Sequence, residues 1–230
     1  MCRVRTFVSG LRIWLCDDRQ AGRYWGMAPR HATAASDATL VKIVDAALQL
    51  TESTSGAWLA CKSGCSQCCV GVFAINQLDA LRLRNGAAEL SLVDSKRAAR
   101  VRERAVESTE RLRSAFPGDP ISGLLDENAE GSEEFDSFAN DEVCPVLDPE
   151  TGTCDLYSSR PMTCRVFGPP VRSDEGLGVC ELCYHGATSE EIAACEMVPD
   201  PENLEAVLVK ELEERTGVRG KTLVAFALTR

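Results

Sequence analysis

The chain has 230 residues, of which 44% are apolar, 6% are aromatic and 12 are cysteines, and its formal net charge is −10. The apolar fraction is large enough for a folded core, which excludes wholesale disorder, and the length suits one domain with a small appendage. The acidic balance argues against nucleic acid as a partner, and no apolar run reaches the roughly 20 residues that span a bilayer, so we expect no membrane partner either.

Residues 1–35 show little hydrophobic periodicity. We expect them to form a disordered extension, or to precede a true start at Met27. Arg12 interrupts the apolar part of the first fifteen residues, and no small-residue cleavage site follows, so we expect no secretion signal. The folded domain is therefore expected to span residues 36–230 and to reside in the cytoplasm.

The first predicted helix covers residues 39–52, where apolar residues recur at helical spacing. Ser36 or Asp37 is the expected N-cap, and Gly56 is expected to end the helical region. The predicted buried stripe consists of Leu40, Ile43, Val44, Ala47 and Leu48.

A second helix is predicted to begin at an N-cap, Asn76, and to stop at Asn85-Gly86. A highly charged stretch follows over residues 88–115, and the apolar residues of its expected buried face are Val101, Ala105, Leu112 and Phe116. Glu107 and Arg111 have the spacing of a supporting ion pair on one helix face. We interpret the dense charge of this stretch as a solvated helix face.

Residues 117–140 are acidic and rich in turn formers, which predicts a long loop with one short helical turn. A tight turn around Asp148-Pro149 then predicts a small hairpin between Val146–Leu147 and Cys154–Leu156. This hairpin is the only regular β-structure that we expect outside the C-terminal tail.

Two further helices are predicted near the C-terminus. Thr188 and Glu191 have the spacing of a capping box, which predicts a helix that carries Cys195 as a buried small hydrophobe. Asp200-Pro201 begins another, which ends at Gly217 and buries Leu204, Val207, Leu208 and Leu212. The tail 222–228 is predicted to be a strand or a packed coil. The fold class is therefore mainly α, a small irregular helical domain with cysteine-rich loops and a minor β-hairpin.

The cysteines are the most informative feature of the sequence. Adjacent cysteines pair with each other only through a strained ring, so Cys68-Cys69 argues against a secreted disulfide framework, and tightly clustered thiols in a reducing compartment are typical of metal sites. Thiolates are soft ligands that select zinc, copper(I) or iron–sulfur clusters. The clustered residues are Cys61, Cys65, Cys68 and Cys69, then Cys144, Cys154 and Cys164, and finally Cys180 and Cys183.

Two blocks, CKSGCSQCC at 61–69 and CPVLDPETGTCDLYSSRPMTCRVFG at 144–168, resemble the YkgJ-type cysteine cluster family, which is described as zinc- or iron-chelating. With CELC at 180–183, the resemblance covers roughly residues 58–185, although the first block has three residues, rather than the usual two, between its first two cysteines. The resemblance implies that the seven cysteines of the two blocks are ligands, with Cys183, ahead of Cys180, as the eighth. Eight thiolates fit two four-coordinate centres or one cluster with spare thiols.

Arg160 and Arg165 lie between these cysteines in sequence. Their guanidinium groups could donate hydrogen bonds to metal-bound sulfur or bind an anionic substrate, and we expect the first, by which they tune the site from outside the ligand set. The alternative for Arg160 is that Arg160-Pro161 simply fixes the turn before Cys164. The sequence nominates no catalytic residue.

Three functions fit these features. The first is a metal-binding protein that holds zinc or an iron or iron–sulfur centre for storage, delivery or assembly. The second is an iron–sulfur-dependent enzyme: Cys61, Cys65 and Cys68 have radical-SAM spacing, and flagellin lysine-N-methylases are similar in carrying a cysteine cluster, but alternating strand–helix units and Gly-rich cofactor segments are missing. The third is a structural zinc scaffold that makes protein contacts through the helix at 88–115.

Overall fold

The computed structural model describes residues 3–6, 12–15, 28–62, 64–173 and 176–230. The chain divides into two compact units, residues 1–39 and 40–230. In the first unit, strand β1 (Arg3–Thr6) pairs antiparallel with β2 (Arg12–Leu15). The expected extension at 1–35 falls largely outside the described residues, and it stays a prediction.

Helix α1 spans Ala28–Ser55 and begins earlier than predicted. The predicted caps at Ser36 and Asp37 are wrong, because an alanine-rich run of good helix formers continues the helix back to residue 28. Leu40 and Val44 are buried as predicted, and Gly56 ends the helix with a φ of +52°, in the left-handed region that glycine tolerates. A short 3-10 turn, η2 (Gly56–Trp58), follows.

Helix α2 (Gln77–Val93) begins as predicted, because the Asn76 side chain accepts a hydrogen bond of 3.0 Å from the backbone N–H of Asp79. The predicted stop at Asn85-Gly86 is wrong. Gly86 is buried against a neighbouring segment, where an added Cβ would lie 2.3 Å from Ser159 Oγ. This glycine therefore serves a close approach between segments and does not end the helix.

Helix α2 ends at Val93 and α3 (Ser95–Leu112) begins two residues later, so the charged stretch at 88–115 belongs to two helices. Asp94 separates them, and its side chain accepts a hydrogen bond of 3.0 Å from Arg97 N and caps α3. The predicted buried face of α3 is confirmed. A 3-10 turn, η4 (Arg113–Ala115), closes the helix.

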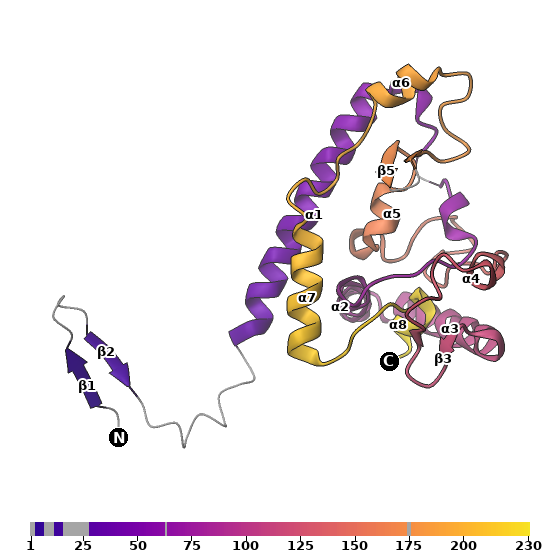
Figure 1. The fold of residues 1–230 in the computed structure, drawn as a ribbon. Helices are drawn as coiled ribbons and strands as arrows, with labels where there is room; N and C mark the ends of the chain where they lie inside the picture. The colour runs from indigo at the N-terminus through magenta and orange to yellow at the C-terminus, as the bar shows by residue number, and fades with distance from the viewer. Residues whose placement is uncertain (1–2, 7–11, 16–27, 63, 174–175) are drawn as a thin grey trace. The chain divides into compact units, whose positions relative to one another are not determined.

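Helices α2 and α3 pack on α8 (Val224–Leu228), which Figure 1 shows beside α3. The prediction of a strand or coil for this tail is wrong, because a short run that is apolar on every side fits a buried helix as well as a buried strand. The shared core consists of Ile75, Ala80, Leu83, Val101, Val146, Leu156, Val224 and Ala227.

Helix α7 (Leu204–Thr216) packs through Leu208 and Leu212 on a core that also contains Leu40 and Val44. Asp200 accepts hydrogen bonds from Leu204 N and Glu205 N at the start of this helix, and Gly217 ends it with a φ of +73°. Val207 is 50% exposed, so its predicted burial is wrong. Before it, α6 (Ser189–Ala194) begins with the predicted capping box, and Cys195 is buried at its end.

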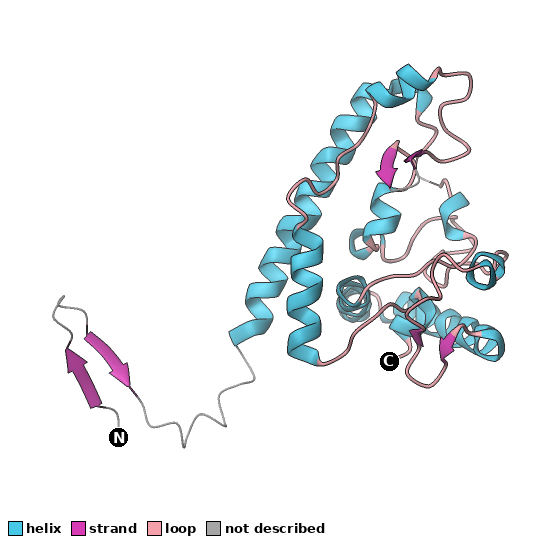
Figure 2. Cartoon of the chain, in the orientation of Figure 1, coloured by secondary structure: helices cyan, strands magenta, loops and turns pink. Residues whose placement is uncertain are grey.

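Long loops with little regular structure occupy the space between α4 and α6, as Figure 2 shows. They contain short helices and one two-stranded ribbon, and the predicted hairpin shrinks to a single bridge between Leu147 and Cys154. The mainly α fold class is confirmed. None of the described helices has the length and apolar character to cross a membrane. The short elements are β3 (Gly118–Asp119), β4 (Leu124–Leu125), α4 (Glu133–Ser137), η3 (Gln67–Cys69), η5 (Tyr157–Ser159), α5 (Met162–Val166), β5 (Val171–Ser173) and β6 (Gly176–Gly178).

Candidate metal centre

The two cysteine blocks lie side by side, although about 75 residues of sequence separate Cys69 from Cys144. Val70 forms an antiparallel bridge with Val143, and Cys144 N donates a hydrogen bond of 2.8 Å to the carbonyl oxygen of Cys69. The backbone pairing therefore places the end of η3, which carries Cys68 and Cys69, directly against the residue that begins the second block.

Two other elements bring Cys154 and Cys164 to the same place. The 148–153 turn folds the chain back so that Leu147 bridges Cys154, which holds Cys154 close to Cys144. Cys164 lies on α5, and the start of α5 is anchored where Met162 N donates a hydrogen bond of 2.9 Å to Asp79 of α2. Five thiols thus gather from three segments. We call Cys68, Cys69, Cys144, Cys154 and Cys164 the five-thiol set.

The members of the five-thiol set act on one another's protonation. Cys69 donates to Cys68, and this hydrogen bond lowers the pKa of Cys68 to about 6, helped by the positive charge of Arg160, while the pKa of Cys69 is raised. Burial, followed by repulsion from neighbouring thiols, raises the pKa of Cys144 to about 12 and also raises that of Cys164. Crowded, desolvated thiolates repel each other, and a bound cation would relieve this repulsion.

A second group contains the remaining cysteines of the predicted ligand set. Cys61 hydrogen-bonds to the Cys183 thiol, and burial, together with Cys183, Cys65 and Cys180, raises the pKa of Cys61 to about 12. Burial, with Cys183 and Cys65, also raises the pKa of Cys180. We call Cys61, Cys65, Cys180 and Cys183 the four-thiol set.

The donor chemistry of both sets suits a thiophilic metal. All ten cysteines that the structure describes are free thiols. Burial raises the pKa of five of them and so disfavours their charged form, namely Cys61, Cys144, Cys154, Cys164 and Cys180. Among the described residues, no three Cys, His, Asp or Glu side chains already converge as metal ligands do. Ligation would therefore require the thiols to rotate toward a common point as they lose their protons.

The two predicted arginines have different surroundings. Arg160 lies 3.9 Å from the centre of the Tyr157 ring, and its charge acts on Cys68 and Cys154. Arg165 is buried and pairs with Asp45 of α1 at 2.6 Å, and it also donates to the Ser158 carbonyl. The structure thus places Arg160 beside the five-thiol set and uses Arg165 to join α5 to α1.

Basic residues of α3 hold the loop that carries Cys144 and Cys154, which the sequence reasoning missed. Arg97 and Arg104 both pair with the buried carboxylate of Asp155, and Arg104 Nε also donates to the Pro145 carbonyl at 2.9 Å. Arg111 forms a two-point ion pair with Glu142, at 2.8 and 3.1 Å. This hydrogen bonding raises the pKa of Arg111, and the charge of the predicted partner, Glu107, adds to the effect. The signal was present, because these three arginines recur every seven residues and therefore share one helix face.

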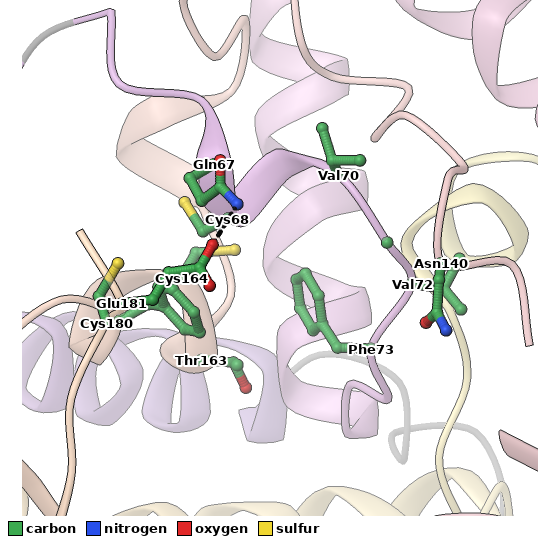
Figure 3. A pocket seen from close by; sticks show the side chains of 12 residues that line it. Gln67, Cys68, Val70, Val72, Phe73, Asn140, Thr163, Cys164, Cys180 and Glu181 are labelled. Atoms are coloured by element: carbon green, nitrogen blue, oxygen red, sulfur yellow. Dashed lines mark hydrogen bonds between the residues drawn. The ribbon is translucent and has the colours of Figure 1, made fainter. Parts of the chain in front are cut away.

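A pocket of about 320 Å³ opens beside the thiols. Figure 3 shows Cys68, Cys164 and Cys180 gathered on one side of it, with Val72 and Asn140 on the other, and a hydrogen bond of 2.8 Å from Gln67 to Glu181 crosses its wall. Two members of the five-thiol set, Cys68 and Cys164, are therefore reachable from outside through this pocket. The lining residues are Gln67, Cys68, Val70, Gly71, Val72, Phe73, Asn140, Thr163, Cys164, Phe167, Cys180 and Glu181.

Comparison with known proteins identifies the family. The model of the CxxCxxCC family, described as a "putative zinc- or iron-chelating domain", matches residues 60–184, which is more than half of the 230-residue chain. Searches of curated proteins and of solved structures found no match. The matched range contains both thiol sets and ends one residue after Cys183. The chain therefore belongs to the CxxCxxCC family.

Proposed function

We propose that this protein binds zinc or iron, the latter as an ion or in an iron–sulfur cluster, through clustered cysteine thiolates, with the five-thiol set at the heart of the site. The observation that carries the proposal is that three segments distant in sequence bring their thiols together. The hydrogen bond from Cys144 N to Cys69 O holds two of these segments side by side. Soft sulfur donors are the ligands that zinc and iron–sulfur clusters prefer.

The surroundings of the five-thiol set support the same function. Each thiolate that binds a cation adds a negative charge to the site. Two arginines offset this charge, because Arg160 acts on Cys68 and Arg104 acts on Cys144. Five thiols exceed the four that a tetrahedral site needs, which leaves one for a bridging or exchange role. A cytoplasmic location belongs to this proposal, because reduced thiols persist in reducing compartments.

The test is elemental analysis after anaerobic purification of the full chain. A colourless protein with stoichiometric zinc, or a brown one with iron and acid-labile sulfide, is the expected result. Replacing Cys68 with Ser and, separately, Cys154 with Ser is each expected to lower the metal content several-fold. If Cys68→Ser lowers the metal content and Cys154→Ser does not, the segments that carry these two cysteines do not share a metal site. If neither zinc nor iron binds, even after reconstitution, the proposed function is wrong.

The pocket favours an enzyme as a second candidate, because a storage or scaffold protein needs no cavity beside its metal. Cys68 and Cys164 line this pocket, so a small molecule entering it would reach the ligands directly. Substituting Co²⁺ and titrating azide or imidazole tests this reading. A change in the visible spectrum indicates a coordination position open to the pocket, whereas an unchanged spectrum indicates a closed thiolate site and favours the binding protein.

A further inference from the structure

The four-thiol set is built by two tight turns brought together by backbone hydrogen bonds. Cys183 N donates to Cys180 O at 2.9 Å, which closes the Cys180–Cys183 turn, and Tyr184 N donates to Trp58 O at 2.8 Å, which docks this turn beside the segment leading to Cys61. In the other turn, Cys65 N donates to Lys62 O at 2.9 Å, next to Gly64 with a φ of +87°. Each turn therefore presents two thiols within a few residues, as the knuckles of structural zinc sites do.

Packing draws three of the four thiols inward, those of Cys61, Cys180 and Cys183. Cys180 and Cys183 are buried in a small cluster against which Cys61 and Leu59 pack. Gly168 lies so close to this cluster that a Cβ there would come within 2.5 Å of Cys61 Sγ. These three thiols consequently lie among other sulfur atoms and apolar groups, where a soft cation would compensate the loss of water around their thiolates.

The two thiol sets pack against different buried clusters. Cys144 and Cys154 pack against the core that α2, α3 and α8 share, whereas Cys61 packs against the cluster that contains Cys180 and Cys183. Cys68 and Cys180 line the same pocket, which makes one shared polynuclear cluster the rival arrangement.

We propose that Cys61, Cys65, Cys180 and Cys183 form a second metal centre, separate from the five-thiol set, which binds one zinc ion or another soft divalent cation. This inference rests on the proposed function and adds the stoichiometry and the partition of ligands. Its role is structural: the ion ties the 180–184 turn to the segment after α1, where Ser55 of α1 already hydrogen-bonds to the Tyr184 hydroxyl. The free energy of metal binding at this centre would stabilise the folded form of loops that have little core of their own.

Cys195 provides the matched control. It is buried in the same cluster as Cys180 and Cys183, but its thiol hydrogen-bonds to the Tyr184 side chain. A variant at Cys195 therefore removes a buried thiol from the same place without removing a proposed ligand.

The experiment is Cd²⁺ titration of the full chain, followed by ¹¹³Cd NMR and by metal content per protein. The wild type is expected to bind two equivalents in two resonances, C180S/C183S to lose one equivalent and one resonance, and C195S to keep both. Far-UV circular dichroism checks the fold. Should C180S/C183S fail to fold, C65S, at a half-buried turn position, is expected to weaken the same single equivalent at least tenfold.

Three results would overturn the second centre. One is a wild type that binds a single equivalent which C65S or C180S/C183S leaves intact. Another is the simultaneous loss of all metal in these variants, which indicates one shared cluster. The third is a C195S variant that loses the same equivalent as C180S/C183S. A wild type that binds no cation at all contradicts the proposed function itself, so the two failures are distinguishable.

Discussion

The helices α2, α3 and α8 and the cysteine-bearing loops beside them bury very different side chains. The helical part closes on aliphatic residues such as Leu83 and Val101, which are almost fully buried. The loops of residues 141–184 contain only short helices and ribbons, and one of their buried clusters consists largely of cysteines with Tyr184. The difference teaches that apolar burial is enough for the helices, whereas the loops depend on tethers: ion pairs to α3 and, on our proposal, metal ions.

Metal removal is the change expected to separate the two parts most strongly. Stripping metal with a chelator under reducing conditions should leave α2 and α3 protected, because aliphatic residues form the core that they share with α8, and Cys144 and Cys154 only pack against it. It should raise amide exchange in residues 141–184 by more than about tenfold, since structural metal binding supplies on the order of 10 kcal/mol to such loops. Hydrogen–deuterium exchange with peptide resolution measures both regions at once, and restoring zinc or iron is the control. Equal effects on helices and loops would contradict the comparison.

The ion pairs to α3 come next in expected effect. Asp155 is buried and accepts from both Arg97 and Arg104, so Asp155→Ala leaves two guanidinium groups without their partner. We expect a loss of about 2 kcal/mol, less than for a fully buried pair because both arginines reach water. Chemical denaturation of the metal-loaded protein measures it.

An exposed ion pair in the same loops provides the control for this prediction. Arg172 pairs with Glu196 at the surface, so Arg172→Ala is expected to leave the denaturation midpoint unchanged. If Arg172→Ala destabilises as much as Asp155→Ala, the loops are held by charge in general and not by the α3 contacts.

Gly86 tests the close approach between helix α2 and the cysteine-bearing loops at Ser159. Alanine in a helix interior is normally more stable than glycine by about 1 kcal/mol, but here the new methyl would lie 2.3 Å from Ser159 Oγ of η5. Because this steric cost exceeds the gain in helix propensity, we expect Gly86→Ala to lower the free energy of unfolding by about 1–3 kcal/mol. Thermal unfolding of Gly86→Ala and of the double variant with Ser159→Gly measures it; a double variant no more stable than Gly86→Ala would show that this contact is not the cause.

The sequence predicts the elements whose signals are local. Asn76, the Thr188–Glu191 box and Gly217 mark helix ends through contacts with their own neighbours, and these predictions are confirmed. The predicted stop at Gly86 is wrong because that glycine is selected by a segment some 70 residues away, which no local pattern reveals. The tail 222–228 has no polar face from which a period could be read, so its helix could not be predicted.

The site divides along the same line. The order and spacing of the cysteines predict the family, but not which thiols meet, because turns and backbone pairing distant in sequence decide that. Cys65 and Cys68 belong to one nine-residue motif, yet they join different sets. Asp155 escaped notice because its importance comes from two arginines of α3, about 50 residues earlier in the chain.

The smallest expected effect lies on α7, a helix that carries no cysteine. Burial raises the pKa of Glu205 on α7, although Asn76 donates a hydrogen bond of 2.8 Å to it. An acid whose folded pKa is raised contributes stability below its unfolded pKa, near 4.3, and this contribution is lost as pH rises through the folded pKa. Glu205→Gln keeps an acceptor for Asn76 without the buried charge.

We therefore expect Glu205→Gln to stabilise the metal-loaded protein at pH 7 by up to about 1 kcal/mol and to make no difference near pH 4. Thermal unfolding at the two pH values measures the change, which corresponds to a rise of roughly 2 °C in Tm for a chain of this size. Glu202, exposed just before α7, supplies the matched control, since Glu202→Gln removes a solvated charge. A Glu205→Gln variant that is less stable than wild type at pH 7 would contradict this prediction. It would mean that the positive charge of Arg82 makes the charged form of Glu205 favourable, so that α7 too depends on an ion pair.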